Sequence, residues 1–363
     1  MRVLFVADKL EATSGAAHKV VSMAAEWERN GHRVWLTTAR APLARTIDEV
    51  VAKHHAIAPA RGLAERIAGE VSFRLLYPHL FARTCARLGI DLIYSRGLPP
   101  APGLKNMIRR VPFVLEINGD VAIERNGRLS RWSHVRSRVI QLGNADGVVF
   151  VSRELRDACA PVPVRSIVIA NPCLPSRAGG APKPARPTLV MIGSARHAWS
   201  GVDQIPKLAA LLPDLDFVLI GAELPGPSNL RCYGALPQVE ADQVMSGCTV
   251  GIGQLARYRM GIHEASPLKS RNYLTLGLPV IQAYQDTDIS EVDGCVLQLP
   301  NREGGVIQNL ERVREFAWRA FQDPTLSSRA LALARGRLSL EAKEADRLAF
   351  MESCRAAHAA RSS

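Results

Sequence analysis

The sequence predicts an α/β protein with two doubly wound domains, each built on a parallel β-sheet with helices on both faces. Three observations lead to this prediction. Short apolar runs alternate with helix-length segments, a Pro-rich stretch interrupts the alternation before it restarts, and 363 residues are enough for two domains of ordinary size. Open sheets of this kind bind ligands at the carboxyl ends of their strands, so we expect the domains to face each other across a cleft.

The first domain is expected over residues 1–172. A helix is predicted from about Ala17 to Arg29, and Gly31 is placed to cap its end. Buried strands rich in Val, Ile, Leu and Phe are predicted at residues 3–7, 32–37, 91–95, 112–117 and 146–151.

The stretch 173–187 is predicted to link the domains, because it is rich in proline and contains two adjacent glycines. The second domain is then expected over residues 188–339, and residues 340–363 are predicted to form an amphipathic C-terminal helix, with the N-terminal domain as its candidate packing surface. Strands of the second domain are predicted at residues 188–193, 217–221, 250–253 and 279–283.

The composition is that of a globular protein, with 47% apolar and 22% charged residues. No apolar run reaches the roughly 20 residues of a membrane-spanning helix, and the N-terminus lacks the apolar core and cleavage site of a signal peptide. Seven cysteines without a C-x-x-C pair favour reduced, buried thiols over a disulfide framework or a zinc site. A cytoplasmic protein is therefore expected.

The net charge of +12 is concentrated in the first half of the chain. Residues 1–175 contain 25 Lys and Arg against 15 Asp and Glu, whereas residues 176–363 contain 21 against 19. This imbalance suggests an anionic partner, such as lipid head groups or a phosphate-bearing acceptor. Nucleic acid is not expected, because no basic and aromatic binding module accompanies the charge.

Two groups of arginines lie among apolar residues in this basic half. Basic residues mixed with Trp and Leu favour peripheral contact with an anionic membrane; an ordinary basic surface over buried helices is the alternative. The first group surrounds Trp132 and comprises Arg125, Arg128, Arg131, Arg136 and Arg138. The second lies in and just before the stretch from Leu63 to Leu88 and comprises Arg61, Arg66, Arg74, Arg83 and Arg87.

The most informative segment covers residues 261–281. Ser266 followed by Pro267 predicts a helix start, with the serine capping free amides and the proline at the first helical position. Lys269 and Arg271 then lie in the first turns, where the helix dipole disfavours cations. An anion bound at the helix N-terminus would resolve this conflict; a solvated lysine on an exposed helix is the alternative.

Two polar residues flank this helix start. Glu264 precedes it, where a carboxylate could hold sugar hydroxyls. Asn272 shares a helix face with Lys269, where an amide could hold a ribose. A solvated loop glutamate and a surface asparagine are the alternatives for these two residues.

The same segment resembles the donor-site motif S-P-L-K-x-x-E-Y-x-x-x-G-x-P-V-I of the retaining GT-B glycosyltransferases of group 1, glycosyltransferase family 4. The resemblance extends along nearly the whole chain. Further family motifs are matched by S-G-A at 14–16, N-G-H-R-V at 30–34, A-D-G-V-V-F-V-S at 145–152, I-A-N-P at 169–172, G-S-A-R-H-A-W-S-G-V-D at 193–203 and N-L-R-C-Y-G at 229–234.

The resemblance implies two Rossmann-like domains (the GT-B fold) and retaining transfer from a nucleoside diphosphate sugar without a metal or other cofactor. The candidate catalytic residues are Arg196 and Lys269, which would stabilise the departing diphosphate, and Glu264, which would hold the sugar. Ser200 stands where the family often has lysine, and Lys269 is the candidate compensator. Asn272 replaces the second glutamate of the family's E-x7-E pair, at a cost of about 1–2 kcal/mol in donor binding.

The resemblance also implies contacts around both substrates. Asn118 and Asp120 are the acceptor-side candidates, although a plain Asn-Gly turn is the simpler explanation of this stretch. The candidate donor-binding residues are Ser14, Gly15, Gly193, Ser266, Pro267, Leu268, Asn272 and Gly234.

The implied acceptor is a saccharide or a lipid-linked sugar, as in surface polysaccharide or glycolipid biosynthesis, in the cytoplasm or at the inner face of the plasma membrane. In the alternative, Asn272 and Ser200 mark an impaired transferase that binds a nucleotide sugar, a glycan or a partner enzyme, which turnover would distinguish. A nucleotide-sugar epimerase fits the motifs less well. A dinucleotide-dependent oxidoreductase is disfavoured, because residues 8–19 contain one glycine instead of G-x-G-x-x-G.

Overall fold

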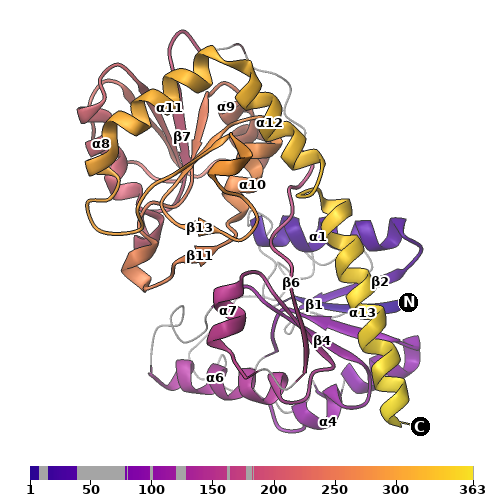
Figure 1. The fold of residues 1–363 in the computed structure, drawn as a ribbon. Coiled ribbons are helices and arrows are strands. Elements are labelled where there is room, and N and C mark those ends of the chain that lie inside the picture. Colours follow the sequence, from indigo (N-terminus) through magenta and orange to yellow (C-terminus); the bar gives the residue numbers. More distant parts are fainter. Residues whose placement is uncertain are drawn as a thin grey trace, which may run out of the picture. The chain divides into compact units, whose positions relative to one another are not determined.

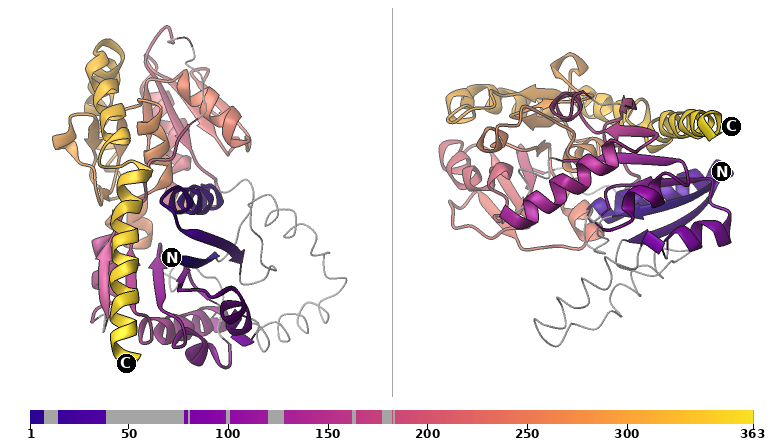
Figure 2. Two further views of the ribbon diagram at one scale, coloured as in Figure 1. Left: turned by 90° about the vertical axis from the view of Figure 1, so that its right-hand side faces the viewer. Right: turned by 90° about the horizontal axis from the view of Figure 1, so that it is seen from below.

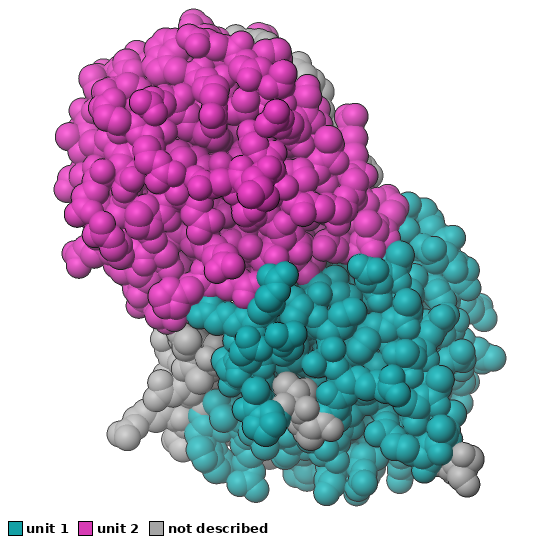
Figure 3. Space-filling model, viewed as in Figure 1, with its two compact units in different colours: residues 1–169, 344–363 teal, residues 170–343 magenta. Residues whose placement is uncertain are grey.

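The computed structural model describes residues 1–7, 15–38, 78–79, 81–98, 101–119, 128–161, 164–176, 182 and 184–362. The chain divides into two compact units, coloured separately in Figure 3. Unit 1 comprises residues 1–169 and 344–363, and unit 2 comprises residues 170–343. The chain therefore passes from unit 1 to unit 2 once and returns once.

Unit 1 contains a six-stranded parallel sheet in the order β2-β1-β3-β4-β5-β6 (Figure 1). Its strands are β1 (Arg2–Ala7), β2 (Arg33–Thr38), β3 (Leu92–Ser95), β4 (Phe113–Ile117), β5 (Gly147–Phe150) and β6 (Arg165–Val168). Its described helices are α1 (Gly15–Arg29), α4 (Leu104–Ile108), α6 (Arg128–Leu142), α7 (Arg153–Ala158) and the later part of α13 (Leu340–Ser362).

The buried apolar runs account for this sheet. All five strands predicted in the first half are present, and β3, β4 and β5 are buried along their whole length. Helix α1 ends at Arg29, and Gly31 follows with φ 80°, as predicted for a glycine cap. Strand β6 escaped prediction because its side chains are exposed or half-buried, so no apolar run marks it.

Helix α13 begins in unit 2 and continues into unit 1, where it runs alongside the sheet (Figure 2). Gly147 at the start of β5 makes room for it. A Cβ at that position would lie 2.3 Å from Cys354 Sγ and 2.8 Å from the ring of Phe350. Farther along α13, His358 Nδ1 lies 3.0 Å from the carboxylate of Asp146.

Unit 2 contains a second six-stranded parallel sheet in the order β14-β12-β10-β7-β8-β9, and a small sheet of β11 and β13. The strands are β7 (Thr188–Ile192), β8 (Asp216–Ile220), β9 (Leu230–Tyr233), β10 (Val250–Ile252), β11 (Glu264–Ala265), β12 (Val280–Gln282), β13 (Gln285–Asp286) and β14 (Val296–Gln298). The helices are α8 (Ile205–Leu211), α9 (Gln238–Ser246), α10 (Leu268–Thr275), α11 (Leu310–Gln322) and α12 (Pro324–Arg335), with 3₁₀ helices η1 (Ala198–Ser200), η2 (Val202–Gln204), η3 (Arg257–Met260), η4 (Glu291–Asp293) and η5 (Ile307–Asn309).

Successive residues of the central strands point to opposite faces of this sheet, so each face has its own apolar core. Leu189 and Met191 of β7 belong to the core under α8 and α11. Val190, between them, belongs to the core that includes Met245 of α9 and Leu274 of α10. Helix α10 is therefore held against the sheet on a defined face.

The fold class is as predicted, with two doubly wound α/β sheets. The seven cysteines are all free thiols, and five of them are buried. Within the described ranges, no helix is long and apolar enough to cross a bilayer.

Candidate functional site

The candidate site lies at the carboxyl edge of the unit 2 sheet, where the strand order changes direction between β7 and β10. Doubly wound sheets bind their ligands at this switch point. Three neighbouring strands each end on a glycine: Gly193 follows β7, Gly221 follows β8 and Gly234 follows β9. This part of the edge presents backbone rather than side chains, so a ligand can approach it closely.

Two of these glycines are required by the packing. A Cβ at Gly193 would lie 2.5 Å from Val202 Cγ1 and 2.6 Å from Ser200 Oγ. Gly221 has φ 93°, and a Cβ there would lie 2.8 Å from the carbonyl oxygen of Gly193. The N–H of Gly221 also donates to the carbonyl oxygen of Gly234 (3.0 Å), which joins the ends of β8 and β9.

Helix α10 brings Lys269 to this edge. The buried hydroxyl of Tyr273 accepts a hydrogen bond from the N–H of Ile192 (2.8 Å), so the helix is anchored to the last residue of β7. One turn earlier, Lys269 Nζ donates to the carbonyl oxygen of Ile192 and to Ser200 Oγ (3.2 Å). The amine therefore lies at the end of β7, beside Gly193.

The surroundings of Lys269 disfavour its charge. Desolvation, together with repulsion from Arg257, lowers the pKa of Lys269 from 10.5 to about 7. Arg257 belongs to η3, which follows β10, and its Nε donates to Gln254 Oε1. In the part of the chain that the structure describes, Lys269 forms no ion pair with a carboxylate. A bound anion would stabilise the charged form of this amine.

Arg257 is not among the residues predicted from the sequence. The signal available was its position shortly after the predicted strand at residues 250–253, because ligands bind at the carboxyl ends of strands. The sequence did not reveal that this strand and β7 are neighbours, which places Arg257 close enough to lower the pKa of Lys269.

The predicted roles of Ser266, Pro267 and Arg271 at the helix start are corrected by the structure. The N-cap residue is Pro267, without a side-chain cap, and α10 begins at Leu268. Ser266 Oγ instead accepts hydrogen bonds from the N–H of Asn171 and from Arg271 Nη2, both at 2.9 Å. Arg271 is fully buried and forms two hydrogen bonds with Asp286, so it is not available to bind an anion at the helix N-terminus.

The remaining donor candidates of unit 2 lie around this helix. Glu264 is buried in the short strand β11, whereas a loop was expected before the helix. Asn272 is half-buried on α10, and its side chain forms no hydrogen bond with another described residue. Arg196 is exposed on the loop after β7, where its own N–H donates to Ser194 Oγ (3.2 Å).

Two candidates of unit 1 are described. Asn118 follows β4, and its Oδ1 accepts a hydrogen bond from Lys19 Nζ (3.2 Å). Lys19 lies in α1 and is paired with Glu116 at 2.7 Å; burial lowers the pKa of Lys19 to about 8 against the raising effect of Glu116. Gly15 is the exposed first residue of α1. The other two candidates, Ser14 and Asp120, lie outside the described residues.

Unit 2 contains two Asp-x-Asp sequences, at residues 214–216 and 286–288. All four carboxylates already pair with cations, and these pairs are Arg314–Asp214, Arg186–Asp216, Arg271–Asp286 and Lys343–Asp288. Among the described residues, no group of three or more His, Cys, Asp or Glu is arranged to hold a metal ion. Metal-independent chemistry stays a prediction.

Replacing Gly193 with alanine is expected to weaken ligand binding at this edge by about tenfold and to destabilise unit 2 by about 1–3 kcal/mol. The added methyl group would displace Ser200 and, through it, Lys269. Gly226→Ala is the matched control, because it introduces an equally close contact away from the ligand edge. Its Cβ would lie 2.5 Å from Cδ2 of Leu230, at the start of β9. Denaturant unfolding and ligand titration check this; equal affinities of the two variants would contradict it.

Comparisons with known proteins support a sugar-transferring enzyme. Residues 13–177 match the family model for Glycosyltransferase Family 4. No curated protein matches the chain. Many solved structures match the chain. Those named below have low sequence identity to it, so they show similarity of fold alone.

Sucrose-phosphate synthase from Thermosynechococcus elongatus is 14% identical, with a TM-score of 0.66 over 98% of this chain and 100% of that one. HepE of Anabaena, solved in complex with UDP, is 15% identical, with a TM-score of 0.62 over 97% and 100%. WaaG, a glycosyltransferase involved in lipopolysaccharide biosynthesis, is 15% identical, with a TM-score of 0.60 over 95% and 98%. The chain is thus similar to the GT-B glycosyltransferases of family 4, in sequence over residues 13–177 and in fold over nearly its whole length, as its motifs predict.

Proposed function

We propose that unit 2 binds the diphosphate of a nucleoside diphosphate sugar at the carboxyl ends of β7 and β10, and that the protein transfers the sugar with retention to a saccharide or lipid-linked acceptor. The observation that carries this proposal is the amine of Lys269, desolvated beside Arg257 at a glycine-lined strand edge. Desolvation and repulsion from Arg257 both disfavour the charged amine of Lys269, and a bound phosphate would offset both effects.

The proposed chemistry follows from charge. Breaking the bond between sugar and diphosphate leaves negative charge on the departing phosphate, which Lys269, Arg257 and the first amides of α10 would stabilise. Arg196, on the exposed loop after β7, would add a third cation. Glu264 would hold hydroxyls of the transferred sugar. Because protein cations supply the counter-charge, the proposal requires no metal.

Support for a sugar nucleotide also comes from a protein of the same fold. HepE of Anabaena has been solved with UDP, with UDP and glucose, and with UDP-glucose. At 15–16% identity this likeness does not name the base or the sugar for the present chain.

The arrangement at Ser200 favours an active transferase over an impaired one. The family often has lysine at this position, and the serine hydroxyl here accepts a hydrogen bond from Lys269 Nζ at 3.2 Å. Lys269 therefore supplies a positive charge at the place that a lysine at position 200 would serve. The proposal assigns Asn272 to the ribose, where a neutral amide replaces a carboxylate.

A nucleotide panel tests the proposed function. We expect one of UDP, GDP and ADP to raise the melting temperature of the protein without added metal. The corresponding nucleotide sugars should release that diphosphate when a saccharide acceptor mixture is present. Stabilisation without release would support the impaired, ligand-binding alternative. No stabilisation by any nucleotide would contradict the proposed function and would leave only an impaired protein that binds a glycan or a partner enzyme.

Nucleotide binding is expected to take up a proton above neutral pH. The free protein has a Lys269 pKa of about 7, and a bound anion raises it, so binding recruits about one proton where the free amine is neutral. Affinity should therefore fall as the pH rises from 7 to 9 and should level off below 7, where the amine is already charged. Calorimetry in two buffers of different ionisation enthalpy measures this uptake; a pH-independent affinity would contradict it.

The proposal includes peripheral contact with an anionic membrane through α6. Trp132 and Val139 on this helix are each 63% exposed and Val135 is 38% exposed, and the Arg136 guanidinium lies 5.6 Å from the Trp132 ring centroid. The helix contains four arginines and no acidic residue. Apolar side chains among cations suit a negatively charged lipid surface.

Co-sedimentation with vesicles tests this contact. We expect binding to phosphatidylcholine vesicles that contain phosphatidylglycerol and not to phosphatidylcholine alone, with loss in Trp132→Ser. Basic surfaces bind by charge alone, so retained binding in Trp132→Ser would contradict the role of the helix face.

A further inference from the structure

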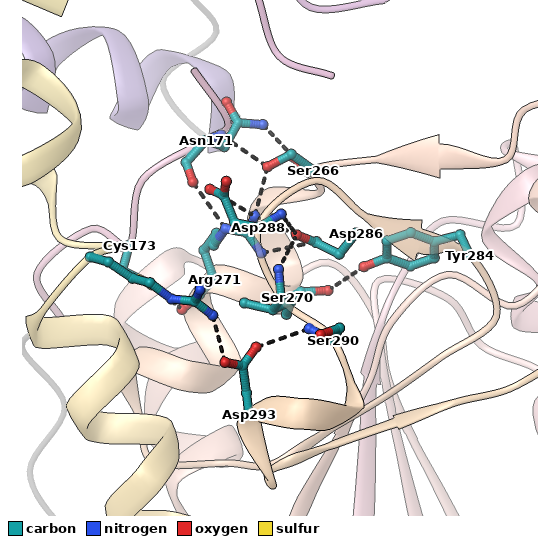
Figure 4. Close-up of polar contacts among 12 residues, drawn as sticks. Asn171, Cys173, Ser266, Ser270, Arg271, Tyr284, Asp286, Asp288, Ser290 and Asp293 are labelled. Carbon is teal, nitrogen blue, oxygen red and sulfur yellow. Dashed lines mark hydrogen bonds and ion pairs between the residues drawn. The ribbon is translucent and has the colours of Figure 1, made fainter. Parts of the chain in front are cut away.

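A buried ionic cluster in unit 2 centres on Arg271 (Figure 4). The arginine is completely buried, and its Nη1 and Nη2 donate to the two carboxylate oxygens of Asp286 at 2.9 and 2.8 Å. Burial opposes the charge, but Asp286 outweighs this effect and raises the pKa of Arg271 above its ordinary range. Arg271 therefore keeps its positive charge although it is completely buried.

Arg271 uses its other donors on two separate segments. Its Nε donates to the carbonyl oxygen of Asn171 (2.9 Å), and its Nη2 also donates to Ser266 Oγ (2.9 Å). Asn171 and Ser266 are joined directly as well, because the N–H of Asn171 donates to Ser266 Oγ (2.9 Å) and its side-chain amide donates to the carbonyl oxygen of Ser266. Figure 4 shows these three residues turned toward one another.

The same cluster contains both places where the chain enters and leaves unit 2. Asn171 is the second residue of the unit, and Lys343 is the last. Lys343 Nζ lies 2.8 Å from Asp288 Oδ2, and Asp288 lies 3.9 Å from Arg271. One buried network thus connects the incoming segment, the outgoing segment and Ser266.

Ser266 lies between the two residues that the proposed function uses. It follows Glu264 by two positions and precedes Lys269 by three. Because Ser266 does not cap α10, its hydroxyl serves only the contacts with Asn171 and Arg271 among the described residues. Its place in the structure, and with it the course of residues 264–269, depends on this arginine.

We propose that Arg271 is a positioning residue that fixes the loop between Glu264 and Lys269 for nucleotide binding, by fastening Ser266 to the segments through which the chain enters and leaves unit 2. This inference rests on the proposed function. Arg271 touches neither donor nor acceptor. Its effect reaches the ligand through Ser266, because a displacement of about 1 Å at binding groups is enough to weaken them strongly.

The double variant Arg271→Met with Asp286→Asn tests this role. It removes both buried charges together, so no unpaired ion is left, and the asparagine that replaces Asp286 can still accept from the N–H of Asp288. We expect the variant to fold with a melting temperature close to that of the wild type. Its dissociation constant for UDP, GDP or ADP, whichever binds the wild type, is expected to rise about tenfold or more.

Arg186 and Asp216 supply the matched control. They form a two-pronged pair in the same unit, at the start of β8, and this pair is partly exposed instead of buried. Arg186→Met with Asp216→Asn should leave nucleotide affinity unchanged. Wild-type affinity in the Arg271 double variant would overturn the proposal. If that variant does not fold, Arg271→Lys decides, since lysine keeps a charge near Asp286 but cannot reach Asn171 and Ser266 together; normal affinity in this variant would also overturn it.

Hydrogen exchange separates this inference from the proposed function. Without ligand, backbone amides of residues 264–270 should exchange faster in the double variant than in the wild type and in the control. Faster exchange with no nucleotide binding to the wild type would overturn the proposed function and the role in nucleotide binding, while leaving the loop anchored by Arg271. Unchanged exchange would overturn the anchoring itself.

Discussion

Lys269→Met is expected to lower the rate of sugar transfer by about 100-fold or more and to abolish nucleotide-induced stabilisation. Methionine keeps the length and packing of the side chain but removes the amine that lies on the carbonyl oxygen of Ile192. The loss should be specific to the ligand. Because the charged form of Lys269 is already disfavoured in the free protein, its removal should not lower the melting temperature.

The control for this variant is Lys207→Met, which removes an exposed lysine from α8 in the same unit. Release of nucleoside diphosphate from the nucleotide sugar that stabilises the wild type best is the measurement. A transfer rate within a few-fold of the wild type in Lys269→Met would show that the amine has no part in the reaction.

Glu116→Gln is expected to destabilise unit 1 by about 3–5 kcal/mol. Glu116 is buried between two cations: its Oε1 lies 2.7 Å from Lys19 Nζ, and its Oε2 lies 3.3 Å from Arg347 Nη1 and accepts from the hydroxyl of Tyr94. These cations hold the pKa of Glu116 far below its usual range, although burial alone would raise it. Glutamine leaves Lys19 buried without its counter-charge, and it removes one of the two carboxylates that pair with Arg347, which keeps Glu344 at 2.9 Å.

Hydrogen exchange of the β3 and β4 amides reports this local loss. The control is Glu291→Gln, whose partner Arg312 is exposed, so that its effect should stay within about 1 kcal/mol. Lys19→Met combined with Glu116→Gln should recover part of the loss. Wild-type stability in Glu116→Gln would contradict this prediction, because it would show that the buried cations do not need the charge of Glu116. In Glu116→Gln, Lys19 also loses the partner that holds its amine in place, and Asn118, the acceptor-side candidate that accepts from this amine, is expected to lose its fixed position.

The sequence predicted what local patterns determine. Buried apolar runs marked β1, β7 and β8 because parallel strands covered on both faces need apolar residues at nearly every position. Short or half-exposed strands such as β6 and β9 carry no such pattern. Lys269 could be found because a cation in the first turn of a helix conflicts with the helix dipole.

The parts that the sequence did not predict depend on contacts between distant segments. Ser266 is a residue type that commonly caps helices, but its hydroxyl instead accepts a hydrogen bond from the N–H of Asn171, 95 positions earlier. Arg271 looks like a second anion-binding cation until Asp286 is seen to pair with it. Arg257 can be recognised as a neighbour of Lys269 only once β10 is seen to pair with β7. In each case a local rule was overridden by a partner whose place only the fold determines.

A crystal structure with the nucleotide that most stabilises the protein would show whether a nucleoside diphosphate binds at the carboxyl ends of β7 and β10. We expect phosphate oxygens within hydrogen-bonding distance of Lys269 Nζ and the Arg257 guanidinium, beside Gly193, with the amine turned from the carbonyl oxygen of Ile192 toward the ligand. A nucleotide bound elsewhere, with Lys269 still on Ile192, would contradict the proposed binding site.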